Sequence, residues 1–173
     1  MSLRSFLYST PVFLTVFLLQ EAVVTQLRLP LGGFNLLLIV ALIWAALSTP
    51  EIGALTGFGA GIAMDLSQSS SGPMGQWTLI MILAGFTISY LGYGDDNFRG
   101  NPISLVFTVA AGVALTRLIY LILGLFLGSE IGSAWSVFFS LFSSAFWSVA
   151  MVPLLLPLVT RLHEALFDVK SRI

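Results

Sequence analysis

About six apolar runs, separated by short polar breaks, occupy almost the whole chain. Each run is close to the length of about 20 residues that a helix needs to cross the hydrocarbon core of a membrane. We therefore expect membrane-spanning helices over residues 6–27, 31–48, 51–66, 77–93, 103–128 and 135–160. The breaks combine Pro, Gly, Ser, Asn and Asp, which favour turns and discourage helix; they are 29–33, 48–51, 69–73 and 94–97.

Composition agrees with this pattern and narrows the class of protein. Of the 173 residues, 57% are hydrophobic and 9% are charged, against about 25% charged in soluble domains. We predict an all-α integral membrane protein, with residues 1–173 forming a single domain. The net charge of −1 gives no basic patch for nucleic acid, and the lack of cysteine excludes disulfides and thiolate metal sites.

Basic residues predict the orientation, because Lys and Arg in short loops stay on the cytoplasmic side. With about six spans and the N-terminus inside, Arg28 lies outside. The other loop and terminal basic residues lie inside: Arg4, Arg99, Arg161, Lys170 and Arg172. Both termini are therefore expected in the cytoplasm. Residues 161–173 mix apolar and charged positions at helical spacing, which predicts a short amphipathic helix on the inner membrane surface.

The third run has a ridge of small residues that ends at an acid. Gly53, Gly57, Gly61 and Asp65 recur at every fourth position, so a helix places them along one side. Such a ridge lets another helix approach closely. Similar ridges occur in the fifth and sixth runs, where a serine-lined permeation path is the alternative to packing: Thr108, Gly112, Thr116, Tyr120, Gly124 and Gly128, then Ser136, Ser140, Ser144 and Ser148.

Three charges interrupt the apolar runs at one depth. Glu21, Asp65 and Arg117 each lie about 14 or 15 residues from the inner end of their run, or roughly 21 to 23 Å along a helix. An arginine facing lipid there costs at least about 2 kcal/mol, so we expect it to face the bundle and to pair with one of the acids. Asp65 is the first candidate. A ligand-binding or partner-binding cluster, and unpaired snorkelling, remain alternatives.

Catalytic and metal-binding sites are not expected. Ser67 to Ser71 belong to an outer loop, whereas His163, the only histidine, lies in the inner tail as a surface residue. These groups cannot meet across about 30 Å of bilayer. One histidine and dispersed carboxylates do not form a metal site either. The sequence therefore predicts a protein that is not an enzyme and has no cofactor.

The third and fourth runs resemble a known family, that of the rod shape-determining protein MreD. The resemblance is most specific over residues 50–93, and it has Met74 where the family commonly has Leu. The residues that carry it, as helix-packing and motif positions, are Gly53, Gly57, Phe58, Gly61, Asp65, Pro73, Gly75 and Gly85.

The resemblance implies an inner-membrane scaffold of the bacterial cell-elongation machinery. Such proteins partner MreC, a bitopic protein, and through it the RodA glycosyltransferase, a penicillin-binding transpeptidase and MreB filaments. The implied fold is similar to the substrate-binding subunit of energy-coupling-factor vitamin transporters, with a pocket that opens outward. A small-molecule-binding transporter subunit is therefore the second hypothesis, and an autonomous channel is the third. For the second, Gln76, Trp77 and Trp135 lie near the outer face together with the three charges.

Overall fold

The computed structural model describes residues 3–27, 34–67, 72–93, 101–128 and 134–167, and within them it contains helices and turns but no strand. The predicted all-α class is confirmed. The α-helices of these residues are α1 (Leu3–Leu19), α2 (Leu36–Leu47), α3 (Pro50–Asp65), α4 (Gln76–Gly92), α6 (Pro102–Phe126) and α7 (Ala134–Phe167). A π-helical segment, η1 (Gln20–Val24), and a 3₁₀ turn, η2 (Thr25–Leu27), continue α1.

Helix boundaries follow local chemistry and agree with the apolar runs to within a few residues, except that α2 begins later. Asn35 precedes α2, and its side chain accepts a hydrogen bond from the Leu38 amide at 2.9 Å. Asn101 precedes α6 in the same way and accepts from the Ile103 amide at 3.1 Å. Both are favoured N-cap residues, because a short side-chain carbonyl satisfies an amide with no partner inside the helix. Pro50 opens α3, where the missing N–H costs nothing.

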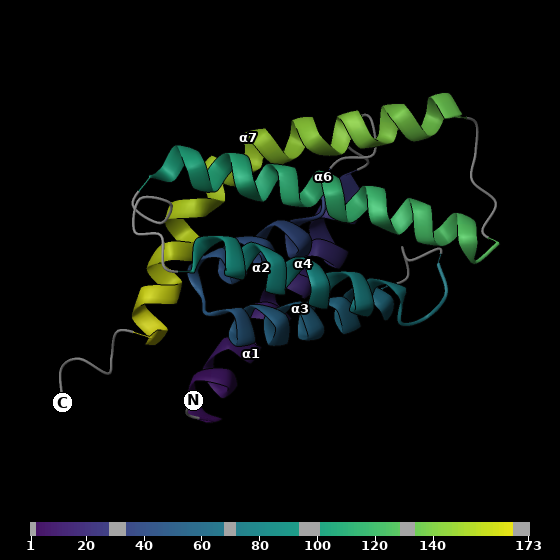
Figure 1. Cartoon of the computed structure of the whole chain (residues 1–173). Helices are drawn as coiled ribbons and strands as arrows, with labels where there is room; N and C mark the ends of the chain where they lie inside the picture. Colours follow the sequence, from purple (N-terminus) through teal and green to yellow (C-terminus); the bar gives the residue numbers. More distant parts are fainter. Residues whose placement is uncertain (1–2, 28–33, 68–71, 94–100, 129–133, 168–173) are drawn as a thin grey trace, which may run out of the picture.

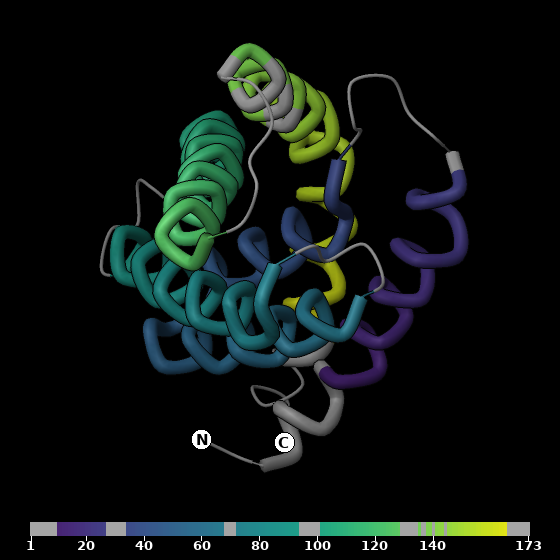
Figure 2. The backbone as a smooth tube through the Cα atoms, turned by 90° about the vertical axis from the view of Figure 1, so that its right-hand side faces the viewer, coloured from purple at the N-terminus to yellow at the C-terminus, as the bar shows by residue number. Residues whose placement is uncertain are grey.

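Helix α2 forms the core of the bundle. Every residue from Leu37 to Ala46 is buried, with at most 4% of its surface exposed. Its sequence is apolar on all sides, as expected for a helix with no face toward solvent. Helix α2 contacts each of the other α-helices, and Figure 2 shows it enclosed by them.

Helix α7 bends across one end of the bundle. Pro153 and Pro157 lie inside it and remove backbone hydrogen bonds, which bends a helix, and Figure 1 shows the change of direction. Residues 161–167 continue α7 instead of forming a separate tail helix, and residues 168–173 lie outside the described residues. The prediction that the sixth helix ends at residue 160 and that a separate helix follows is therefore wrong.

His163 is also not the surface residue that we expected. Its ring meets the Trp44 ring edge-on at a centroid distance of 5.1 Å, and its Nε2 lies 3.2 Å from the Ser48 hydroxyl. The C-terminal part of α7 is thus tied to the end of α2. Figure 1 shows the end of α7 and the start of α1 at the same end of the molecule.

Two described helices have the length and hydropathy needed to cross a membrane, Pro102–Phe126 and Leu141–Ala165. Helix α2 has 12 residues, or about 18 Å, which is shorter than the hydrocarbon core of about 30 Å. Lengths alone therefore do not establish six spans.

Candidate functional site

The glycine ridge of α3 packs against α4 at backbone contact distance. A β-carbon on Gly57 would lie 2.0 Å from the carbonyl oxygen of Met81, and one on Gly61 would lie 2.5 Å from the Cα of Thr78. At the other end of the ridge, a β-carbon on Gly53 would lie 2.6 Å from the carbonyl oxygen of Gly85. The predicted packing role of the ridge is confirmed. Its partner is α4 of the same chain, so a partner protein has no access to it.

Asp65 completes this hairpin by capping α4. Gly75, the residue before α4, has φ +93°, a conformation that favours glycine, and it has no side chain to cap the helix. The Asp65 carboxylate instead accepts hydrogen bonds from the amides of Trp77 and Thr78, each at 3.0 Å, and from the Thr78 hydroxyl at 2.6 Å. These are the second and third amides of the helix, the usual targets of an N-cap, and a negative charge there also suits the helix dipole.

Glu21 lies on the π-helical segment and serves a second junction. It accepts a hydrogen bond from the Ser67 hydroxyl, just after α3, at 2.5 Å. Its neighbour Gln20 accepts from the Leu36 amide at the start of α2, at 2.7 Å. Residues of η1 thus join the end of α1 to both α2 and α3.

Arg117 does not pair as expected. In the part of the chain that the structure describes, its Nε is buried without a hydrogen-bond partner, and no ion pair joins it to Asp65 or Glu21. The phenol of Tyr120, one turn further along α6, lies within electrostatic reach of the guanidinium. The predicted Asp65–Arg117 pair is therefore corrected, because α4 amides occupy the Asp65 carboxylate.

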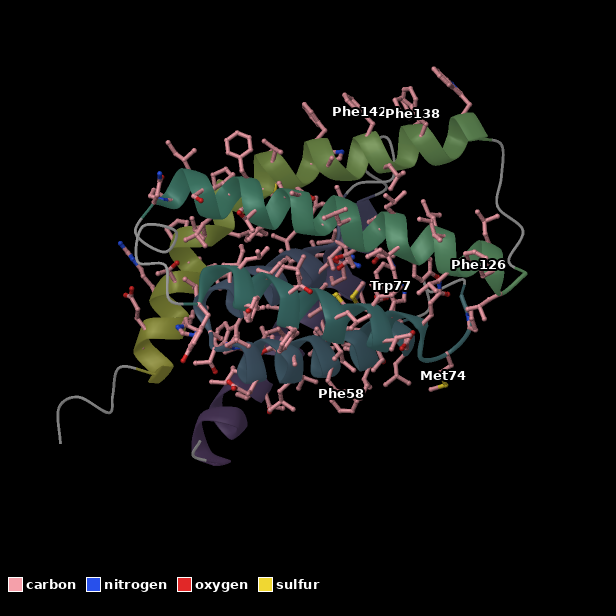
Figure 3. All side chains as sticks on the ribbon, viewed as in Figure 1. Phe58, Met74, Trp77, Phe126, Phe138 and Phe142 are labelled. Carbon is pink, nitrogen blue, oxygen red and sulfur yellow. The ribbon has the colours of Figure 1, made fainter. Side chains whose placement is uncertain are left out.

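A polar and aromatic contact joins the start of α4 to α6 beside Arg117. Gln76 donates from Nε2 to the carbonyl oxygen of Tyr120 at 2.7 Å. The rings of Trp77 and Tyr120 stack at a centroid distance of 4.2 Å and an interplanar angle of 17°. Figure 3 shows Trp77 between α4 and α6. The side-chain oxygen of the same glutamine, Gln76 Oε1, is buried without a hydrogen-bond partner.

Sequence reasoning placed Gln76 and Trp77 near this end of the bundle but missed their partner. Tyr120 was assigned to a packing ridge, and nothing local to residue 120 indicates a stacking partner 43 positions earlier. Thr78 and Ser67, which bind the two carboxylates, were missed for the same reason. Gly75 could have indicated the role of Asp65. Glycine has no side chain to cap the helix that follows it, so the first amides of that helix need an acceptor from elsewhere.

The remaining motif residues lie on the surface of this hairpin. Phe58 is 45% exposed on the outer side of α3, and Met74 is 80% exposed in the turn before α4. Figure 3 shows both pointing away from the bundle. Pro73 is exposed beside Met74, and its carbonyl oxygen accepts from the Gln76 amide at 3.2 Å.

The other small-residue ridges serve packing in part; Gly128, at the end of the ridge in the fifth run, is exposed and a β-carbon there would meet no atom within 4 Å. A β-carbon on Gly112 would lie 2.5 Å from Cδ1 of Ile88, so this part of α6 faces α4. Thr116 is buried and donates to the Gly112 carbonyl. Ser148 is buried. The side chains of three predicted ridge serines lie outside the described residues: Ser136, Ser140 and Ser144.

A cavity of about 630 Å³ lies at the opposite end, between the start of α6 and the bent half of α7. Most of its lining is apolar; the residues are Pro102, Ile103, Val106, Pro153, Leu156, Pro157, Thr160 and Arg161. In the described part of the chain, no group of three or more His, Cys, Asp or Glu side chains is placed to hold a metal ion.

Comparison with known proteins adds no information on the family or the function of this chain. No protein-family model, curated protein or solved structure matches the chain.

Proposed function

We propose that this protein is a membrane-embedded scaffold, not an enzyme, of the bacterial cell-elongation machinery, and that it binds an MreC-like bitopic partner. Through that partner it would act on RodA, a penicillin-binding transpeptidase and MreB. The observation that carries the proposal is the α3–α4 hairpin. Four of the residues that resemble the MreD motif build it together, because Gly57, Gly61 and Gly85 make the close helix contact and Asp65 caps α4. A motif used in this way supports a shared fold, and the partners are proposed from the resemblance.

Exposed apolar side chains support the membrane location. Large hydrophobic residues are exposed on α1, α3, α4, α6 and α7, which leaves α2 as the helix whose whole surface is covered. Soluble monomers rarely expose contiguous apolar patches of more than a few hundred Å². We propose that the bundle lies in the bacterial inner membrane, with the shorter helices α2 and α3 held within it by packing against the other helices.

The first part of α7 is our candidate for the partner-binding surface. Trp135, Phe138, Phe142 and Phe146 recur at helical spacing, and each is at least 59% exposed. Figure 3 shows Phe138 and Phe142 directed away from the bundle. Aromatic side chains are enriched at protein interfaces, and a bitopic partner offers one transmembrane helix to cover such a face.

We expect reporter fusions to place both termini in the cytoplasm. The start of α1 and the end of α7 lie at one end of the molecule, and basic residues favour the inside for both. A fusion after Arg172 should report a cytoplasmic position, and one within 69–72 a periplasmic position. A periplasmic C-terminus would exclude the proposed orientation.

We expect co-purification in mild detergent to capture an MreC-like partner, and the double variant Phe138→Ser/Phe142→Ser to reduce capture about tenfold. Phe107→Ser is the matched control, because Phe107 on α6 is 66% exposed and Phe142 is 64% exposed. Equal losses in both variants would indicate a general effect of lost apolar surface. Unchanged capture in the double variant would remove α7 as the binding surface.

The second candidate function is a small-molecule-binding subunit of a vitamin-type transporter. Unpartnered buried polar atoms on α4, α6 and α7 favour it, namely Gln76 Oε1, Arg117 Nε and Ser143 Oγ. Buried polar groups in proteins are normally hydrogen-bonded, so a ligand would explain them. Co-purification separates the two candidates, because this function requires an ATPase pair with a coupling subunit in place of a bitopic partner.

A further inference from the structure

Arg117 carries a charge within the bundle that no described residue balances. Its Nε is buried without a hydrogen-bond partner, while the side chain as a whole is partly exposed. The two acids at its predicted depth are engaged elsewhere, Asp65 by α4 amides and Glu21 by Ser67. A guanidinium within a membrane-embedded bundle is unfavourable without a counter-ion, so we expect an anion from outside the described residues at this position.

An unpartnered acceptor lies beside Tyr120, one turn along α6 from Arg117. Gln76 Oε1 and the Tyr120 hydroxyl each lie within 2.5 Å of the position that a β-carbon would take on Gly72. These two oxygens are therefore neighbours, and the Tyr120 phenol is within electrostatic reach of Arg117. Arg117 lacks an anion, and Gln76 Oε1 lacks a hydrogen-bond donor. A headgroup that carries both an anionic group and a donor would satisfy both.

The surface next to Arg117 is apolar. Leu121 and Leu125 lie one and two turns further along the same side of α6; Leu121 is partly exposed and Leu125 is 61% exposed. A ligand whose charged group reaches the guanidinium would lay its remaining part on these side chains. This arrangement suits an amphiphile better than a small hydrophilic ion, because the apolar part gains contact area that water otherwise covers.

We propose that Arg117 anchors a binding site for an anionic amphiphile. A phosphate or carboxylate binds the guanidinium, whose planar donors match both groups. A hydroxyl or ammonium of the same headgroup donates to Gln76 Oε1, and the apolar part lies along α6. We assign the anionic group to a lipid headgroup, and binding of a small soluble anion is the outcome that would contradict this assignment. The inference holds whether or not the protein is a scaffold.

The test uses the full-length protein in nanodiscs of phosphatidylcholine, with and without phosphatidylglycerol, and measures the melting temperature and the lipid retained in native mass spectrometry. A third sample has phosphatidylcholine discs with inorganic phosphate. We expect phosphatidylglycerol to raise the melting temperature by about 4 °C and to be retained on extraction. The same rise with inorganic phosphate alone would show that the site takes a small anion without an apolar part, and would overturn the proposed amphiphile. No rise in either sample would overturn the proposal.

Variants connect the effect to this site. Arg117→Gln should reduce retention of phosphatidylglycerol about tenfold and abolish the rise in melting temperature. Arg161→Gln is the control, because Arg161 is an exposed arginine at the opposite end of the bundle. Equal retention by the wild type and Arg117→Gln would overturn the proposal, as would equal losses in the two variants.

A second pair of variants keeps the proposal testable if Arg117→Gln does not accumulate. Gln76→Glu and Gln76→Met both remove the donor to the Tyr120 carbonyl oxygen, so both should have a lower melting temperature in phosphatidylcholine. Only Gln76→Glu adds a carboxylate beside Tyr120, where it competes with the bound anion. We therefore expect the further rise with phosphatidylglycerol to be lost in Gln76→Glu and to persist in part in Gln76→Met. If both variants respond to phosphatidylglycerol as the wild type does, the site does not bind an anion.

Discussion

Replacing Gly57 with leucine is expected to lower the free energy of unfolding by on the order of 3 kcal/mol, the upper end of overpacking. The first added carbon alone would lie 2.0 Å from the Met81 carbonyl oxygen and 2.6 Å from the carbon of that group. Both atoms belong to the α4 backbone, which cannot rotate away as a side chain can. Helix α4 must therefore move outward along the whole hairpin. The melting temperature in detergent and the amount of protein in the membrane measure the effect.

Gly59 provides the matched control on the same helix. It is exposed, and a β-carbon there meets no atom within 4 Å. Gly59→Ala is expected to stabilise the protein by about 0.5 to 1 kcal/mol, because alanine loses less backbone entropy in a helix interior. Equal melting temperatures for Gly57→Leu and Gly59→Leu would contradict the packing role of the ridge.

Features that depend on the order of residues within one helix could be predicted from the sequence. The spacing of Gly53, Gly57 and Gly61 fixes a bare side of α3, since helical geometry alone determines which residues share a face. Apolar runs and turn residues likewise predicted most helix boundaries to within a few residues, the start of α2 and the end of α7 excepted. The burial of α2 also had a signal, because residues 36–47 contain no polar side chain, and a helix that is apolar on all sides is a buried one.

Contacts between helices could not be predicted in the same way. Matched depth gives the axial level of Asp65 and Arg117, but it gives neither the neighbouring helix nor the direction in which each side chain points. Two carboxylate oxygens also have competing partners in a bundle, and here the free amides at the start of α4 are nearer in sequence and fixed by the hairpin. Arg117 was thus correctly identified as unusual, while its predicted partner was wrong.

Asp65→Ala is expected to lower the free energy of unfolding by about 1 to 3 kcal/mol, because it removes the acceptor for the Trp77 and Thr78 amides and for the Thr78 hydroxyl. Asp65→Asn should cost much less, since asparagine is a good N-cap residue and keeps a carbonyl oxygen. If Asp65 instead formed an ion pair, Asp65→Asn and Asp65→Ala would lower the free energy of unfolding about equally, because both remove the charge. Melting temperatures of the two variants separate the two roles.

A double-mutant cycle with Arg117→Gln extends this test to the pairing itself. Because Asp65 binds the start of α4 and is not joined to Arg117 in the described residues, the effects of Asp65→Ala and Arg117→Gln on the free energy of unfolding should add within about 0.5 kcal/mol. Recovery of stability in the double variant would show that the two charges interact. That outcome would give Arg117 a counter-ion within the chain and remove the need for a bound anion. Additive effects, together with a small effect of Asp65→Asn, leave Arg117 as a charge that requires a partner from outside the described residues.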